Sequence, residues 1–247
     1  MTDLSKPPFT VDWSPRFDFG GPRSVAALEG VCVHTTENDF STRAEDIANY
    51  QLTSQTGSYH VIADSRGTLL RENTDDWVTW SSGNRGNNVY VHIAFVARAR
   101  FTRAQWLSQD RMLRAGALYV AHWCKVRGFP AIWRPDLRNR PRGITTHNAT
   151  RVFGGTDHTD PGPNFPHDVF IRYVNEYLNS VGKPPAPIKG DDEMTPDQAR
   201  QLAYIAGQLG PWPQLGKNDK GQPLTLVDAV AELRAEVADL TRRLEGQ

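Results

Sequence analysis

Residues 89–97, VYVHIAFVA, are the most strand-like stretch of this 247-residue chain. Such segments, rich in β-branched and aromatic residues, favour strands, and an almost continuous apolar run is typical of a strand buried on both faces. A strand of this kind needs packing layers above and below it, which helices supply in α/β domains. The segment therefore predicts a central strand of a sheet with helices on both of its faces.

Short apolar runs alternate with longer helical patterns on either side of this segment. The expected strands, with a turn at 64–67, cover residues 30–34, 59–63, 68–70 and 143–147. The expected helices cover residues 43–54, 102–127 and 167–179. Strands that alternate with helices indicate an α/β domain, which ends near residue 180.

The remaining segments differ in composition from this domain. Residues 1–27 contain several prolines and a Gly-Gly pair, and are expected to form an N-terminal extension. The α/β domain then spans 28–180, and 181–197 is a linker that is first proline-rich and then acidic. Residues 198–247 are expected to form a helical C-terminal region.

An apolar seam marks this C-terminal region. Its members recur at alternating spacings of four and three, at Leu226, Val230, Leu233, Val237, Leu240 and Leu244. β-Branched residues at heptad position a with leucine at d favour a parallel dimer, so residues 224–245 are predicted to support a homodimer. The seam covers fewer than three heptads, and the alternative is an amphipathic helix that docks on its own domain.

Composition excludes several classes of function. The chain has 28 Lys+Arg and 28 Asp+Glu, which argues against a nucleic acid partner held by a bulk positive field. No apolar run reaches the roughly 18 residues of a membrane span, and the first residues lack an apolar signal core. We expect no membrane insertion and no signal peptide. Cys32 and Cys124 lie in apolar stretches and are expected to be reduced, buried thiols.

Two histidines stand where predicted strands end. His34 closes the strand 30–34, His147 closes the strand 143–147, and Asp160 follows in the loop HTDPGPNFP. Loops at strand ends are held by a rigid sheet and commonly carry active sites. Two imidazoles and one carboxylate form a typical catalytic zinc shell, although each of these residues alone is more often structural.

Four segments in and around these residues follow one another along the chain: VCVHTTE, SYHVIADSRGTLLR, ITTHNAT and HTDPGPNFPHDVF. Over residues 28–179 they resemble the zinc-dependent N-acetylmuramoyl-L-alanine amidases of the phage endolysin and peptidoglycan recognition protein superfamily. The resemblance implies a central mixed β-sheet flanked by helices, with Zn2+ held by His34, His147 and Asp160. It also implies hydrolysis, by a zinc-activated water, of the amide between N-acetylmuramic acid and L-alanine in bacterial peptidoglycan.

The same resemblance suggests three supporting catalytic residues. Tyr59 stands where these amidases carry an active-site tyrosine that can hydrogen-bond the oxyanion; the alternative is a packed strand tyrosine. His158 stands where the family often has a lysine, and as an imidazolium it would be a positive donor; the alternative is an exposed loop histidine. His92 lies where several relatives have a glutamate base, and the alternative is a satisfied, buried histidine.

Substrate contacts and the biological setting are further expectations. Thr36 and Asn148 neighbour the predicted zinc ligands, and Trp80 in the loop 77–88 could stack on a sugar or peptide. The resemblance points to a phage endolysin that accumulates in the host cytoplasm and reaches the wall through a holin-type pore. The rival interpretations are a peptidoglycan-binding module without catalysis, a bacterial wall-recycling amidase, and an oligomeric scaffold organised by the heptad seam.

Overall fold

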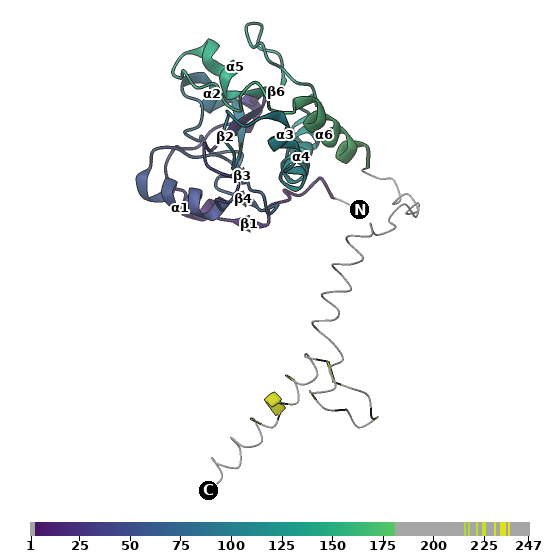
Figure 1. The fold of residues 1–247 in the computed structure, drawn as a ribbon. Coiled ribbons are helices and arrows are strands. Elements are labelled where there is room, and N and C mark those ends of the chain that lie inside the picture. The colour runs from purple at the N-terminus through teal and green to yellow at the C-terminus, as the bar shows by residue number, and fades with distance from the viewer. Residues whose placement is uncertain are drawn as a thin grey trace. The chain divides into compact units, whose positions relative to one another are not determined.

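A computed structural model describes residues 3–180 and the positions 215, 217, 221, 224, 225, 230, 233–235 and 237. The chain divides into two compact units, Met1–Pro185 and Ala186–Gln247. The first unit contains a six-stranded sheet with helices on both faces (Figure 1). The predicted α/β class is therefore confirmed.

The sheet is mixed and has the strand order β1-β4-β3-β5-β2-β6. Its strands are β1 (Val11–Asp12), β2 (Gly30–Thr35), β3 (Val61–Ala63), β4 (Leu69–Arg71), β5 (Tyr90–Phe95) and β6 (Gly143–Thr146). The β3–β4 pair is the predicted antiparallel hairpin, and the other neighbouring strands run parallel. β5 is buried along its whole length between β3 and β2, as its apolar sequence predicts.

Helices cover the sheet from both sides (Figure 1). They are α1 (Ala44–Ser54), α2 (Asn84–Val89), α3 (Arg103–Leu107), α4 (Asp110–Arg127), α5 (His147–Thr150) and α6 (His167–Ser180). The first unit also contains three short 3-10 helices among its described residues: η1 (Ser14–Arg16), η2 (Val25–Ala27) and η3 (Arg151–Phe153). Within the part of the chain that is described, no helix has the length and apolar character to span a membrane.

The side chains of β2 alternate between two different environments. Val31 and Val33 pack in the main core with α4 and α6. Cys32 and His34 point to the opposite face, because successive side chains of a strand alternate in direction. That face is covered in part by α1 in a second, smaller core. The alternation thus places His34 away from the main core, on the face that carries the polar residues discussed below.

Three segments differ from the sequence prediction. The helix predicted at 102–127 is two helices, because the backbone of Gln109 is not helical (φ −101°, ψ 42°) and α4 begins only after it. The loop 77–88 contains most of α2. Residues 3–27 are more than a loose extension, since β1 pairs with β4 and Leu4 is only 1% exposed.

The second unit is described at only a few positions of the heptad seam. Val230, Leu233 and Val237 are helical, and their exposed fractions are 49%, 59% and 54%. Leu226, Leu240 and Leu244 lie outside the described residues, as does the linker at 181–197. Homodimerisation through 224–245 stays a prediction.

Candidate active site

The sheet brings three polar residues from distant segments together. β2 runs parallel to both β5 and β6, so the carboxyl ends of these strands meet at one edge. His34 is the penultimate residue of β2, and His147 directly follows β6 at the start of α5. Asp160 comes from the loop between η3 and α6. The edge of the sheet thus gathers the three residues that the sequence predicts as metal ligands.

Their side chains converge on one point. One ligand atom from each of His34, His147 and Asp160 lies within 4.8 Å of the others, and all three residues are buried. His147 Nδ1 is 2.9 Å from Oδ1 of Asp160, and His34 Nδ1 is 3.3 Å from Oδ2 of the same carboxylate. Both imidazoles therefore turn Nδ1 towards Asp160.

Each of these three side chains also contacts a neighbouring group of the protein. His34 Nε2 lies 2.9 Å from Nδ1 of His92, and His147 Nε2 lies 2.9 Å from the Thr156 hydroxyl. The backbone N–H of Thr35 donates to Oδ2 of Asp160 at 3.1 Å. Such outer contacts fix the rings and the carboxylate in one orientation, as is usual for metal ligands.

Burial and charge set the protonation of this cluster. Burial lowers the pKa of His34 to about 4, so its imidazole is neutral at neutral pH. Burial alone would raise the pKa of Asp160, but its close contacts with His147 and His34 outweigh burial and hold that pKa below its usual range. His34 therefore presents a neutral imidazole and Asp160 an ionised carboxylate, the forms that bind a metal.

These residues fit a zinc ion. Two imidazole nitrogens and one carboxylate oxygen are the donor types of catalytic zinc sites, which leave a further position open. His34 Nδ1 is buried and has no hydrogen-bond partner in the structure. A cation between Nδ1 and the carboxylate would satisfy both groups.

A second donor group, Cys32, His34 and His92, is also close enough to hold a metal. All three residues are fully buried, and none of them lines a pocket described below. Burial raises the pKa of the Cys32 thiol well above its usual value, so forming the thiolate that a metal needs costs more here than in water. The group of His34, His147 and Asp160 is therefore the better candidate for a catalytic metal.

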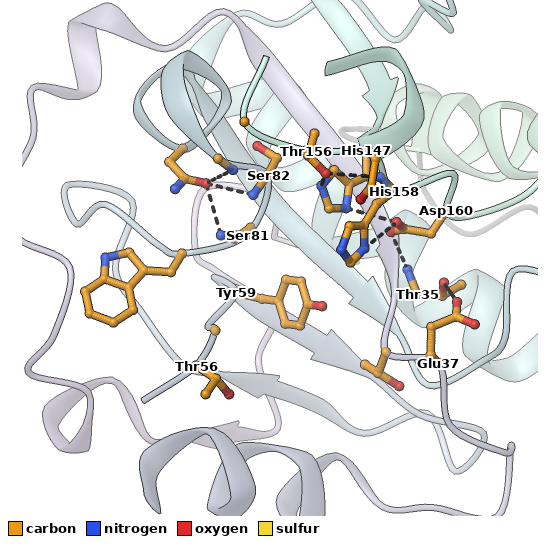
Figure 2. Close-up of a pocket in the computed structure, with 17 residues that line it drawn as sticks. Thr35, Glu37, Thr56, Tyr59, Ser81, Ser82, His147, Thr156, His158 and Asp160 are labelled. Carbon is orange, nitrogen blue, oxygen red and sulfur yellow. Dashed lines mark hydrogen bonds and ion pairs between the residues drawn. The ribbon is translucent and has the colours of Figure 1, made fainter. Parts of the chain in front are cut away.

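A polar cavity of about 550 Å³ lies beside the group of His34, His147 and Asp160 (Figure 2). The metal donors His147 and Asp160 contribute to its wall. Its other labelled lining residues are Thr35, Glu37, Thr56, Tyr59, Ser81, Ser82, Thr156 and His158. Two of the three predicted ligands thus face a space in which a substrate can bind, and His34 lies buried behind them.

Tyr59 and His158 both reach this pocket, as the sequence predicts. Tyr59 faces the metal cluster, with its ring centroid 5.3 Å from that of His34. Burial, and secondly the negative charge of Asp160, raise the pKa of Tyr59, so the phenol keeps its proton. His158 stacks on His147 at 4.8 Å, is 64% exposed, and places Nδ1 3.8 Å from Oδ1 of Asp160.

The structure does not bring His92 into the pocket. Its side chain is fully buried behind His34, and its Nε2 lies 3.2 Å from the carbonyl oxygen of Gly86. Both ring nitrogens are therefore engaged with protein groups. This placement matches the alternative of a satisfied, buried histidine better than that of a base in contact with substrate.

Of the three residues predicted to contact substrate, two line the pocket and one does not. Thr36 and Trp80 line the pocket; the Thr36 hydroxyl is buried without a partner, and Trp80 is 45% exposed beside Phe19. Asn148 is not among the lining residues. Its side chain is exposed and contacts Arg151, while its backbone N–H donates to the carbonyl oxygen of Asp160.

Sequence reasoning missed three residues that shape the site. Thr156 contacts His147, and its position two residues before His158 was the available signal. Glu37 lines the pocket, and its carboxylate accepts from the Ala99 N–H at 2.9 Å. The side-chain oxygen of Asn87 accepts from the backbone N–H groups of residues 81–83 and so shapes the pocket wall.

Comparison with known proteins gives two family matches. The model described as N-acetylmuramoyl-L-alanine amidase matches residues 24–163, which is more than half of the chain. The model described as Rv3766 C-terminal domain matches residues 194–240. The first match includes all three predicted metal ligands, and the second lies in the C-terminal unit.

Two further similarities come from Staphylococcus aureus. The bifunctional autolysin is 27% identical over 191 residues, which are 73% of this chain and 14% of that protein. The chain therefore spans about a seventh of the length of this relative. The crystal structure of hydrolase AmiA in complex with its ligand has a TM-score of 0.56 at 23% identity, covering 68% of this chain and 84% of that one. This structural likeness shows a shared fold.

Proposed function

This chain belongs to the N-acetylmuramoyl-L-alanine amidase family, and from that membership we propose that it hydrolyses the amide between N-acetylmuramic acid and L-alanine in bacterial peptidoglycan. The observation that carries the proposal is the convergence of His34, His147 and Asp160 beside a polar cavity. Amide hydrolysis needs an activated water and stabilisation of an oxyanion. Both needs can be met by groups at this wall of the cavity.

We assign Zn2+ to the two Nδ1 atoms and the Asp160 carboxylate. The ion, when bound, supplies a Lewis acid that polarises the scissile carbonyl and makes a water more acidic. The protein's part is to keep the His34 imidazole neutral, which its burial achieves, and the Asp160 carboxylate ionised, which its contacts with His147 and His34 achieve. The contacts of Thr35, Thr156 and His92 keep the donors in place.

Tyr59 and His158 supply donors for the developing negative charge. The raised pKa of Tyr59 keeps the phenol as a hydrogen-bond donor throughout the neutral range. His158, as an imidazolium, would add a positive donor from the exposed side of the pocket. Preorganised donors of this kind act in the transition state without a cost of reorganisation.

The walls of the cavity suit a glycopeptide. The Thr36 hydroxyl is buried at the pocket wall without a hydrogen-bond partner among the described residues, and a substrate amide or hydroxyl group that reached it would satisfy it. The half-exposed indole of Trp80 offers an apolar face for a sugar ring or a peptide side chain. Most other lining groups are hydroxyl, carboxylate or backbone groups, which suits a polar substrate.

Digestion of purified peptidoglycan tests this function. The zinc-loaded full chain should release stem peptides with new L-alanine amino termini and no new reducing sugars, and His147→Ala should release none. A chain that binds zinc and peptidoglycan but produces no L-alanine termini would be a binding module instead. That result would contradict the proposed hydrolysis while leaving the metal site intact.

The finer proposal is that the enzyme is a phage endolysin which acts on the host wall for cell lysis. It rests on the resemblance of the motifs around His34, Tyr59, His147 and Asp160 to endolysin amidases. An endolysin must cut polymeric sacculi, whereas a wall-recycling amidase acts on soluble fragments. Initial rates on intact sacculi and on soluble muropeptides from the same wall separate the two, and a preference for soluble fragments would favour recycling. Synthesis in host cytoplasm should cause lysis only when a holin-type pore is co-produced.

A further inference from the structure

The two ring nitrogens of His34 have different neighbours, and a chain of hydrogen bonds behind the ring decides which one carries the proton. Nε2 faces His92, and Nδ1 faces the Asp160 carboxylate. A neutral imidazole has one N–H donor and one acceptor. The tautomer of His34 therefore depends on what His92 offers to it.

This series of hydrogen bonds starts at a carbonyl oxygen, which can only accept a hydrogen bond. The carbonyl oxygen of Gly86 lies 3.2 Å from Nε2 of His92, so this nitrogen carries the proton. His92 is fully buried, and its two ring nitrogens contact a carbonyl oxygen and an imidazole, neither of which is an anion that could pair with a positive charge. In the neutral ring that results, Nδ1 of His92 is an acceptor.

The position of the proton on His92 in turn fixes the position of the proton on His34. Because Nδ1 of His92 accepts, the contact of 2.9 Å requires that His34 Nε2 donates. His34 Nδ1 then holds a bare lone pair 3.3 Å from Oδ2 of Asp160, which is also an acceptor. Two acceptors face each other without a proton between them. A cation at this point resolves the mismatch, and Nδ1 is already in the form that binds it.

We propose that His92 is a positioning residue, which fixes His34 as the Nε2–H tautomer and so directs the Nδ1 lone pair to the metal. The proposal rests on the proposed function only in taking zinc as the cation. It gives His92 a role different from that of a base, since both of its nitrogens are used inside the protein. It also differs from direct ligation by His92, because the same Nδ1 cannot accept from His34 and bind a metal.

Histidine NMR on the metal-free full chain tests the first step without any variant. Long-range correlations of the ring nitrogens should show His34 and His92 both protonated at Nε2, with His34 assigned from a His34→Gln spectrum. Protonation of His34 at Nδ1 would overturn the proposal. This readout does not depend on activity, so it remains decisive even where the wild-type chain fails to bind zinc and the proposed function fails.

Two substitutions at one position test the second step through zinc affinity, measured by competition with a chelator. His92→Leu removes the acceptor and should weaken zinc binding about 10- to 100-fold. His92→Asn places a side-chain oxygen near the former Nδ1 and should recover most of that loss. Equal losses in both variants would mean that His92 only fills space, and unchanged affinity in His92→Leu would also contradict the proposal.

His60 provides the matched control. It is fully buried, its ring lies 5.6 Å from that of His92, and its Nδ1 accepts from the His92 backbone N–H at 3.0 Å. His60→Leu therefore removes a neighbouring buried imidazole without removing the acceptor of His34. Its zinc affinity should stay close to the wild-type value, with folding of each variant checked by its melting in the metal-free form. A loss as large as that of His92→Leu would overturn the specific role of His92.

Discussion

The backbone N–H of Thr35 donates a hydrogen bond of 3.1 Å to Oδ2 of Asp160, across 125 residues of sequence. This bond connects the end of β2, which carries His34, to the loop that carries the carboxylate. The orientation of Asp160 is therefore set by the sheet itself and does not depend on the loop alone. Its ionisation is set by the two imidazoles that it contacts.

Asp160→Asn separates orientation from charge. The amide oxygen can still accept from Thr35, but the neutral side chain is a weak zinc ligand. We expect a clear loss of bound zinc and a fall in hydrolysis on the order of 100-fold or more. Zinc content and the rate of L-alanine release measure the two effects. Asp157→Asn, in the same loop and pocket, should bind zinc normally, and full activity in Asp160→Asn would exclude Asp160 as a ligand.

Tyr59→Phe tests the oxyanion donor. Removal of the phenolic hydroxyl should lower kcat on the order of 100-fold while KM and zinc content change little, because the hydroxyl acts mainly in the transition state. Tyr50→Phe, at a tyrosine of α1 that is 64% exposed, is the matched control. A Tyr59→Phe enzyme with wild-type kcat would show that Tyr59 only packs beside His34.

Trp80→Ala tests recognition of the substrate. Loss of the indole face should raise KM about three- to tenfold with a smaller effect on kcat, since stacking contributes on the order of 1 kcal/mol. Trp80→Phe keeps an aromatic face and should lie between the two. If KM for a muramoyl-peptide is the same in all three proteins, Trp80 has no part in binding.

Acidification should destabilise the metal-free protein through its buried histidines. Burial, and secondly the charge of Arg23, lower the pKa of His60 well below its unfolded value near 6.5. The unfolded chain therefore binds more protons below pH 6.5, and stability is lost as pH falls. One such group costs about 1.4 kcal/mol for each pH unit below 6.5 until its folded pKa is reached. Urea unfolding of the wild type at pH 7.5, 6 and 5 measures the slope. His60→Gln should show a shallower one, and an equal slope would contradict this assignment.

The residues of the site that could be predicted are those whose position follows from a short local segment of sequence. His34 and His147 could be placed because each stands at the end of a predicted apolar strand, and parallel strands bring their ends to one edge. The roles of His92 and Thr156 could not be predicted, because each depends on which ring nitrogen of a ligand it meets after folding. For His92 the sequence supports either a base or a buried histidine, and only its place behind His34 separates them.

The fold shows the same limit. The alternation of strands and helices predicts the layers, but the two-residue strand β1 leaves no periodic signal and gains its place by pairing with β4. Likewise, the interruption at Gln109 lies within a continuous helical pattern. The place of β1 is decided by its contact with a distant part of the chain, and the break at Gln109 has no counterpart in the apolar periodicity.

The heptad seam should hold two copies of the chain together and have little effect on the rate of hydrolysis. Val230, Leu233 and Val237 are about half exposed, so a partner helix could cover them. We expect sedimentation to show a dimer of the full chain and a monomer of a chain ending at Pro185, with equal rates on a soluble muramoyl-peptide because the first unit holds the whole cavity. Leu233→Glu should also give a monomer, since it places a charge in the seam, whereas Arg234→Glu beside the seam should remain dimeric. A monomeric full chain, or a dimer that survives Leu233→Glu, would contradict the predicted contact.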